Sequence, residues 1–203
     1  MTDLVWSADC AGCGRELAGP LCALCRLELL GPVGRREAAA PRLNPADGGP
    51  PLPVWSSAWY TGAVRRAVVA WKRTGRGELG REFSRAVART AQAAAPLLGA
   101  ICGQVAVVPA PSRWVRRWSR PGGGSEVLAA AVAGGLAGCG LSATVVDALV
   151  RAPLAREQAG RTSRQRQAGR EGSTRVRRPQ VVRPGAPGPR AQARARRAPA
   201  GPG

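Results

Sequence analysis

Two cysteine pairs near the start of the chain constrain its fold more than any other feature. Each pair has the spacing Cys-x2-Cys and eight residues separate the pairs, which are Cys10 with Cys13 and Cys22 with Cys25. Each pair can place two thiolates on one turn, so the four sulfurs can surround one tetrahedral ion, the geometry that Zn²⁺ prefers. Two buried or redox-active dithiols are the alternative, which the spacing disfavours. We therefore expect a small structural zinc knuckle whose folding depends on the metal.

The composition excludes several other kinds of site. The 203 residues contain no histidine, which removes His-based acid–base catalysis, Ser-His and Cys-His nucleophile pairs, and His-containing metal sites. The chain has 31 basic and 12 acidic residues and a net charge of +19. Lys72 is the only lysine and Ala, Gly and Pro are abundant, so GC-rich codons explain much of the arginine content. The charge is therefore weaker evidence for a nucleic-acid partner than its size suggests.

The start of the chain does not resemble a secretory signal peptide, because Asp3 and Asp9 flank only a few apolar residues. We expect a cytoplasmic protein, in which closely spaced cysteines bind metal rather than form disulfides. Cys102 and Cys139 are expected to be small buried residues. Residues 127–146 are uncharged but rich in Gly and Ala, which makes transfer into a membrane unfavourable. They are expected to form a buried helix and a strand, without membrane insertion.

Composition divides the chain into four regions. Residues 1–30 hold the knuckle, residues 31–53 are a Gly- and Pro-rich linker, residues 54–175 form a larger domain, and residues 176–203 are a tail. The tail is rich in Arg, Pro, Ala and Gly and contains no acidic or aromatic residue. Such a segment cannot bury enough apolar surface to offset its ordering entropy, so we expect it to be disordered.

Apolar patterning in the larger domain predicts alternating strands and helices. Strands are expected at 54–60, 104–108 and 143–150, and the apolar residues of 63–71 and 78–96 recur at helical spacing. Ser125 is expected to cap a further helix that runs to about Gly138, with Glu126 in its first turn. Strands that alternate with helices favour an α/β fold with a parallel sheet.

Several short motifs follow the cysteines in order. They are Tyr60-x-Gly62; Trp71-Lys72-Arg73-x-Gly75; Val107-Val108-Pro109-Ala110-Pro111 with the basic residues Arg113, Arg116, Arg117 and Arg120; and Arg151, Gln158-Ala159-Gly160 and Arg166. With the cysteine quartet, which is the most specific of them, they resemble the ComF family over about residues 8–175. ComF-like proteins join a four-cysteine zinc module to a phosphoribosyltransferase-type domain and are associated with DNA uptake in competence. The resemblance implies a parallel sheet with flanking helices and a link to DNA uptake or nucleotide metabolism.

The resemblance also suggests where phosphoribosyl diphosphate would bind. A transferase must hold this polyanion and its departing diphosphate with backbone amides, cations and usually Mg²⁺. The candidate loop consists of Pro109, Ala110, Pro111 and Arg113. It leaves a predicted strand at the edge where ligands bind in open α/β sheets, although a rigid exit turn explains it equally well. Lys72 is a further candidate phosphate contact, or a side chain that lies along an amphipathic helix.

The C-terminal part of the resemblance departs from the family pattern. Where the family has Arg-Gly-aromatic-Asn/Asp, this chain has Arg120-Pro121-Gly122-Gly123-Gly124-Ser125, and the usual Asn near Gly169 is absent. The family continues past Gly172 with a strand, an acidic pair and a Thr- and Gly-rich phosphate loop, whereas no acid follows Glu171 here. We therefore expect an incomplete sheet with exposed apolar edges and no transferase activity. A frameshift near residues 160–180, or a truncation with a new end, would explain the departure.

A second hypothesis is a small zinc-containing nucleic-acid-binding protein. The stretch Arg113–Arg120 interleaves arginines with Trp114 and Trp118, and such side chains can contact the phosphates and stack on the bases of single-stranded DNA or another nucleic acid. Because the two tryptophans are four residues apart, an apolar stripe on a helix is an equally good explanation. A third hypothesis, a scaffold whose knuckle contacts a protein partner, has no specific feature in its favour.

Overall fold

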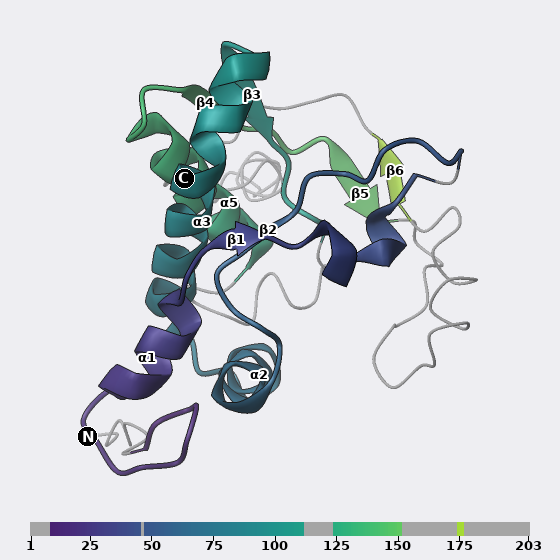
Figure 1. Ribbon diagram of the computed structural model, residues 1–203. Coiled ribbons are helices and arrows are strands. Elements are labelled where there is room, and N and C mark those ends of the chain that lie inside the picture. The colour runs from purple at the N-terminus through teal and green to yellow at the C-terminus, as the bar shows by residue number, and fades with distance from the viewer. Residues whose placement is uncertain (1–8, 46, 112–123, 152–173, 177–203) are drawn as a thin grey trace, which may run out of the picture.

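The computed structural model describes residues 9–45, 47–111, 124–151 and 174–176, which form helices, short sheets and the loops between them (Figure 1). The helices are α1 (Ala23–Leu30), α2 (Gly62–Val69), α3 (Leu79–Ile101) and α5 (Ser125–Ala137), with short helical turns at η1 (Glu37–Ala39), η2 (Pro41–Leu43) and η3 (Ala70–Thr74). The strands are β1 (Gly34–Arg35), β2 (Trp55–Ser56), β3 (Gln104–Val107), β4 (Ser142–Val145), β5 (Leu149–Arg151) and β6 (Thr174–Val176). The expected mixture of α and β structure is therefore present.

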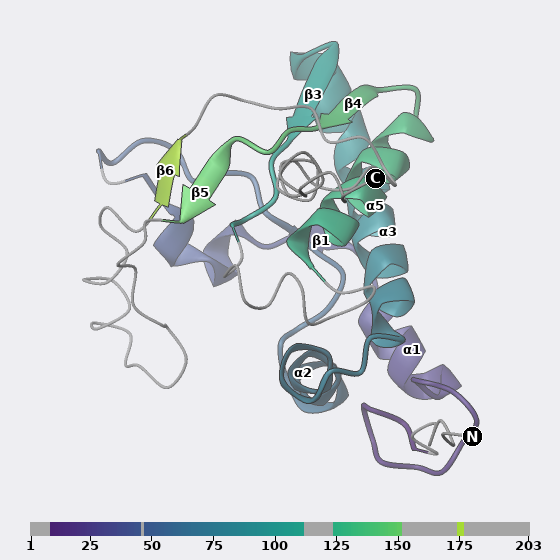
Figure 2. The ribbon, with the colours of Figure 1, turned by 180° about the vertical axis from the view of Figure 1, so that it is seen from behind.

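The long helix α3 connects two apolar cores. Its first half contributes Leu79, Phe83 and Ala86 to a core shared with α1 and α2, and its second half packs on α5 and on β3 and β4. Figures 1 and 2, two opposite views, place α1 near one end of α3 and β3 and β4 near the other. Helix α3 continues past Pro96, where the pattern predicted its end. Burial of Ala95 keeps this turn helical, although Pro96 cannot donate a backbone hydrogen bond.

Strands β3 and β4 form a parallel pair, and α5 lies between them in the sequence. Gln104 pairs with Ser142 and Val107 with Val145, so the two strands are in register along their full length. The predicted strand at 104–108 and its parallel pairing are confirmed. The unit buries Leu136 of α5 in the second core.

The antiparallel pairs are short. Strand β1, in the segment expected to be a linker, pairs with β2, which covers only two residues of the strand predicted at 54–60. The strand predicted at 143–150 is divided into β4 and β5, and β5 pairs with β6. Among the described residues, the expected parallel sheet is thus limited to β3 and β4. Except for Val176, which ends β6, the tail expected to be disordered lies outside these residues.

The start of α5 differs from the predicted cap. Gly124 occupies the N-cap position, and Ser125 is the first helical residue. The Ser125 hydroxyl instead donates a hydrogen bond of 2.6 Å to the carbonyl oxygen of Ala110, so it ties the helix to the loop that follows β3. As expected, the uncharged stretch 127–146 forms a helix followed by a strand. No helix of the described part of the chain combines the length and apolarity needed to cross a membrane.

Candidate metal centre

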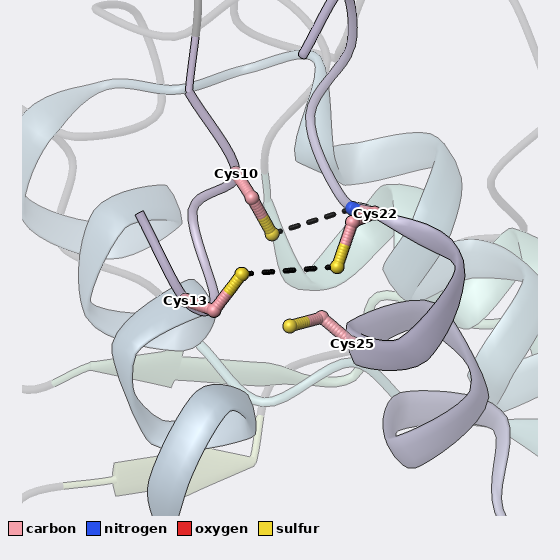
Figure 3. Close-up of side chains that lie close together, drawn as sticks. All are labelled: Cys10, Cys13, Cys22 and Cys25. Atoms are coloured by element: carbon pink, nitrogen blue, oxygen red, sulfur yellow. Dashed lines mark hydrogen bonds between the residues drawn. The ribbon is translucent and has the colours of Figure 1, made fainter. Parts of the chain in front are cut away.

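The four knuckle cysteines point toward one another, as Figure 3 shows. Their sulfur atoms all lie within 4.8 Å of one another. Cys10 and Cys13 belong to a tight loop, Cys22 is the N-cap residue of α1, and Cys25 lies in the first turn of that helix. The Sγ atoms of Cys13 and Cys22 are 3.8 Å apart. In tetrahedral coordination with Zn–S bonds of about 2.3 Å, the sulfur atoms lie about 3.8 Å from one another, so the donor set fits Zn²⁺.

Backbone hydrogen bonds give the first pair of cysteines its tight turn. The Cys10 amide donates to the carbonyl oxygen of Arg15 at 2.8 Å, and the Gly14 amide donates to that of Cys10 at the same distance. Gly14 has a φ of 79°, a left-handed conformation that residues with a side chain rarely adopt. The Cys22 amide donates to the sulfur of Cys10 at 3.3 Å, which joins the two pairs and stabilises a thiolate (Figure 3).

Gly12 is needed for a different reason, which is close packing. A Cβ atom at this position would lie 2.8 Å from the sulfur of Cys25 and 3.2 Å from the Cβ of Ala63 in α2. The carbonyl oxygen of Gly12 accepts a hydrogen bond from Nε of Arg66, also in α2. The ligand loop is therefore pressed against both α1 and α2.

The protonation behaviour of the sulfurs differs with their surroundings. Burial disfavours the Cys10 thiolate, but hydrogen bonds from the backbone amides of Cys22, Cys13 and Gly12 outweigh it and lower the pKa of Cys10 to about 6. A hydrogen bond from the Cys25 backbone lowers the pKa of Cys22. Burial, together with the neighbouring cysteines, raises the pKa of Cys25. Four adjacent thiolates repel one another, which a divalent cation between them would offset.

Arginine side chains connect the cluster to the rest of the protein. Arg26 in α1 forms an ion pair with Glu82 in α3, and the proximity of Glu82, with smaller contributions from Cys22 and Cys10, raises the pKa of Arg26. Arg76 donates to the carboxylate of Asp9 at 3.1 Å and to the Asp9 carbonyl oxygen at 2.9 Å. Arg26 thus links α1, which carries Cys22 at its N-cap and Cys25, to α3, and Arg76 holds Asp9, which directly precedes Cys10.

The knuckle shares its core with the helices that follow it. Leu21, Cys25 and Leu29 recur every four residues and are buried with Trp71 of η3 and Phe83 of α3. The ring centroids of Trp71 and Phe83 are 4.9 Å apart. Sequence reasoning did not identify this packing, although the spacing of the three knuckle residues is a helical signal that could have revealed it.

An open cavity of about 520 Å³ lies beside the ligand loop. It is lined by the ligand loop and by Arg66, Ala70, Thr74 and Arg76. Cys13 is exposed, Cys22 is half-buried, and Cys10 and Cys25 are buried. Four protein sulfurs complete a tetrahedron without an open position for water or substrate, so the arrangement suits a structural rather than a catalytic metal.

The predicted phosphate-binding residues lie on two other elements. Lys72 is exposed in η3, next to Trp71 of the first core. In the loop after β3, Pro109 is buried, Ala110 is exposed and Pro111 is half-buried. Arg113, the remaining predicted residue, lies outside the described residues, as does the rest of the stretch to Arg120.

Cys102 and Cys139 lie outside the cluster. Cys102 is half-buried, and its thiol donates to the carbonyl oxygen of Leu98 at 3.4 Å. Cys139 is exposed, so its expected burial is wrong: it lies in the turn that follows α5, and it is not part of the second core.

Comparisons of the chain with protein-family models, with curated proteins and with solved structures find no match. The described residues thus establish a mixed α/β structure with four cysteines placed closely enough to bind one metal ion.

Proposed function

We propose that the chain binds one Zn²⁺ ion through Cys10, Cys13, Cys22 and Cys25, and that the ion has a structural role. The observation that carries this proposal is the approach of all four sulfurs to within 4.8 Å of one another. A donor set of sulfur alone disfavours Ca²⁺ and Mg²⁺, which take oxygen ligands. Iron also accepts four thiolates and is the main competitor. The metal content of the purified protein distinguishes iron from zinc.

The proposed ion stabilises more than the knuckle itself. Cys10 and Cys25 are buried in the same core as Trp71 and Phe83, so the metal fixes one wall of that core. Zinc knuckles of this size have too small a core to fold alone, and metal binding supplies on the order of 10 kcal/mol of folding free energy. Loss of the ion should therefore loosen α2 and the first half of α3 as well as the ligand loop.

We further propose that the protein is a ComF-like relative of the phosphoribosyltransferases, related to DNA uptake or nucleotide metabolism. The motif order in the sequence supports this proposal, and so does the parallel pair β3 and β4 with the Pro109 loop at the carboxyl end of β3. The 203 residues contain no acid after Glu171, so the acidic pair that contacts the ribose hydroxyls in the family has no counterpart in this part of the sequence. The proposed consequence is a protein without transferase activity, for which Mg²⁺ has a role only if phosphoribosyl diphosphate still binds.

Two measurements test these proposals separately. Elemental analysis of the full chain, purified without added metal, should find one zinc per chain and a colourless protein. Iron, with absorption in the visible range, or a metal-free folded protein would contradict the zinc proposal. Calorimetry of the zinc-loaded chain with phosphoribosyl diphosphate and Mg²⁺ should show no binding. Micromolar binding would contradict the proposed loss of the phosphate site while leaving the zinc proposal intact.

A further inference from the structure

Two neighbouring aromatic side chains are exposed in the turn between β2 and α2. Trp59 is 61% exposed and Tyr60 is 59% exposed, whereas Trp71 and Phe83 are buried in the first core. Single exposed apolar residues are common on protein surfaces, but adjacent exposed aromatic rings are typical of binding surfaces. The turn therefore presents two rings that do not contribute to the core.

Arginines accompany the aromatic residues of this region. The guanidinium carbon of Arg36 lies 5.3 Å from the centroid of the Trp59 ring, and that of Arg35 lies 5.6 Å from the centroid of Trp55, its cross-strand partner. Arg36 donates a hydrogen bond to the carbonyl oxygen of Arg35, whereas Arg35 also pairs with Glu37. Within the described residues, Arg36 forms no ion pair with a carboxylate that would neutralise it.

This combination indicates the chemistry of the ligand. A guanidinium held beside a ring that remains largely exposed can meet a phosphate while a base stacks on the ring. In duplex nucleic acid the bases are already stacked inside the helix, so only a single strand can offer both groups at once. The net charge of +19 adds a long-range attraction for a polyanion.

We propose that Trp59, Tyr60 and Arg36 form a binding surface for single-stranded nucleic acid. The surface is separate from the sulfur cluster and from the loop after β3, and it depends on neither transferase activity nor family membership. Stacking on an aromatic ring tolerates every base, so the expected recognition is independent of sequence. The surface also differs from the stretch Arg113–Arg120, since it is built from described residues of β1 and of the turn before α2.

The test is the fluorescence anisotropy of a labelled 15-nucleotide oligothymidine titrated with the zinc-loaded full chain. Trp59→Ala should weaken binding on the order of tenfold or more, because one stacked base is lost, and Trp59→Phe should retain most of the affinity. Leu24→Ala is the matched control, since Leu24 is exposed to a similar extent (66%) in α1 and is not aromatic. Equal affinities of Trp59→Ala and Leu24→Ala would overturn the proposal.

The charge contribution has its own control. Arg36→Gln should weaken binding and flatten its dependence on salt by about 0.7 in log–log slope, the change expected for one phosphate contact with a single strand. Arg89→Gln removes the same charge from an exposed position in α3, and it should change neither the affinity nor its dependence on salt. If the two variants behave alike, only the overall charge matters and the proposed surface is wrong.

A wild-type experiment guards against misfolded variants. Oligonucleotides that carry 5-iodouracil should crosslink under light to Trp59 or Tyr60, as mapped by mass spectrometry of the digested complex. Crosslinks confined to other segments would overturn the proposal even if the chain binds nucleic acid. A duplex of the same length should compete poorly, and equal competition by the duplex would also overturn it.

Discussion

The guanidinium of Arg26 makes two hydrogen bonds with the buried carboxylate of Glu82, one of 3.0 Å from Nε and one of 3.1 Å from Nη2. Arg26 belongs to the helix that holds Cys25, whereas Glu82 lies 56 residues later in α3. Arg26 also donates to the carbonyl oxygen of Leu21 at 3.2 Å. This one side chain therefore joins the metal centre to the helix that connects both cores.

Replacing Arg26 should destabilise the protein while its metal ligands stay intact. Arg26→Met leaves the Glu82 carboxylate buried, with Arg85, at 3.5 Å, as its remaining ion-pair partner among the described residues. Removing one partner of a fully buried pair costs about 3–5 kcal/mol, but the Arg26 side chain is 37% exposed, so we expect a smaller loss of about 1–3 kcal/mol. Urea unfolding of the zinc-loaded chain measures it. Arg81→Met, at an exposed position of α3, should change the stability by less than about 0.5 kcal/mol, and equal effects of both variants would contradict this role.

Two adjacent glycines of α5 should respond in opposite ways to alanine. A Cβ on Gly135 would lie 2.5 Å from the Ala88 carbonyl oxygen in α3, whereas a Cβ on Gly134 meets nothing within 4 Å. Gly135→Ala should therefore force the helices apart and cost about 1–3 kcal/mol. Gly134→Ala should stabilise the protein by up to about 1 kcal/mol, because alanine favours the helix. Thermal unfolding of both variants is the measurement, and a neutral Gly135→Ala would show that α3 and α5 are not this close.

Two exposed cysteines separate metal binding from general thiol chemistry. Cys13→Ser removes one of the four ligands and should lower the zinc affinity at least about tenfold, with partial loss of helical circular dichroism in the presence of a chelator. Cys139→Ser changes a thiol that is also exposed but lies outside the cluster, and it should leave both quantities unchanged. Competition with a chromogenic chelator gives the affinities. Retention of wild-type affinity by Cys13→Ser would remove Cys13 from the ligand set.

The sequence predicted local features of this protein better than its long-range packing. The spacing of the cysteines identified the four residues whose sulfurs converge, because two Cys-x2-Cys turns leave few other arrangements for them. Apolar periodicity identified α2, α3 and the strand β3. In each case residues close in the sequence determine the structure.

The connections between distant segments could not be predicted in the same way. The packing of Gly12 against Cys25 and Ala63 depends on how α1 and α2 meet. The ion pair of Arg26 with Glu82 depends on the same docking, and a single sequence gives no signal for it. The sequence position of Ser125 predicts a helix N-cap, yet its hydroxyl donates a hydrogen bond to the carbonyl oxygen of Ala110 instead.

The antiparallel pair of β1 and β2 should loosen in acid through one carboxylate. Oε1 of Glu37 accepts hydrogen bonds from Nε of Arg35 at 2.6 Å and from the Val54 amide at 3.2 Å. A hydrogen bond from its own backbone amide and the contact with Arg35 lower the pKa of Glu37. The folded β1–β2 pair therefore favours the ionised carboxylate of Glu37 over its protonated form. Its contribution is fully present above the ordinary pKa of a glutamate, and it is lost as the pH falls through the lowered value.

Amide hydrogen exchange of Val54, followed by NMR across this pH range, measures the effect. After correction for the intrinsic pH dependence of exchange, protection of the amide should decrease as Glu37 becomes protonated. Glu37→Gln keeps the shape of the side chain without its charge, so its protection should be lower near neutral pH and nearly independent of pH. The same acid-induced loss in Glu37→Gln would assign the transition to another group. The β1–β2 pair precedes the turn that carries Trp59. Anisotropy titrations of the oligonucleotide at the same pH values would therefore show whether this carboxylate also supports nucleic-acid binding.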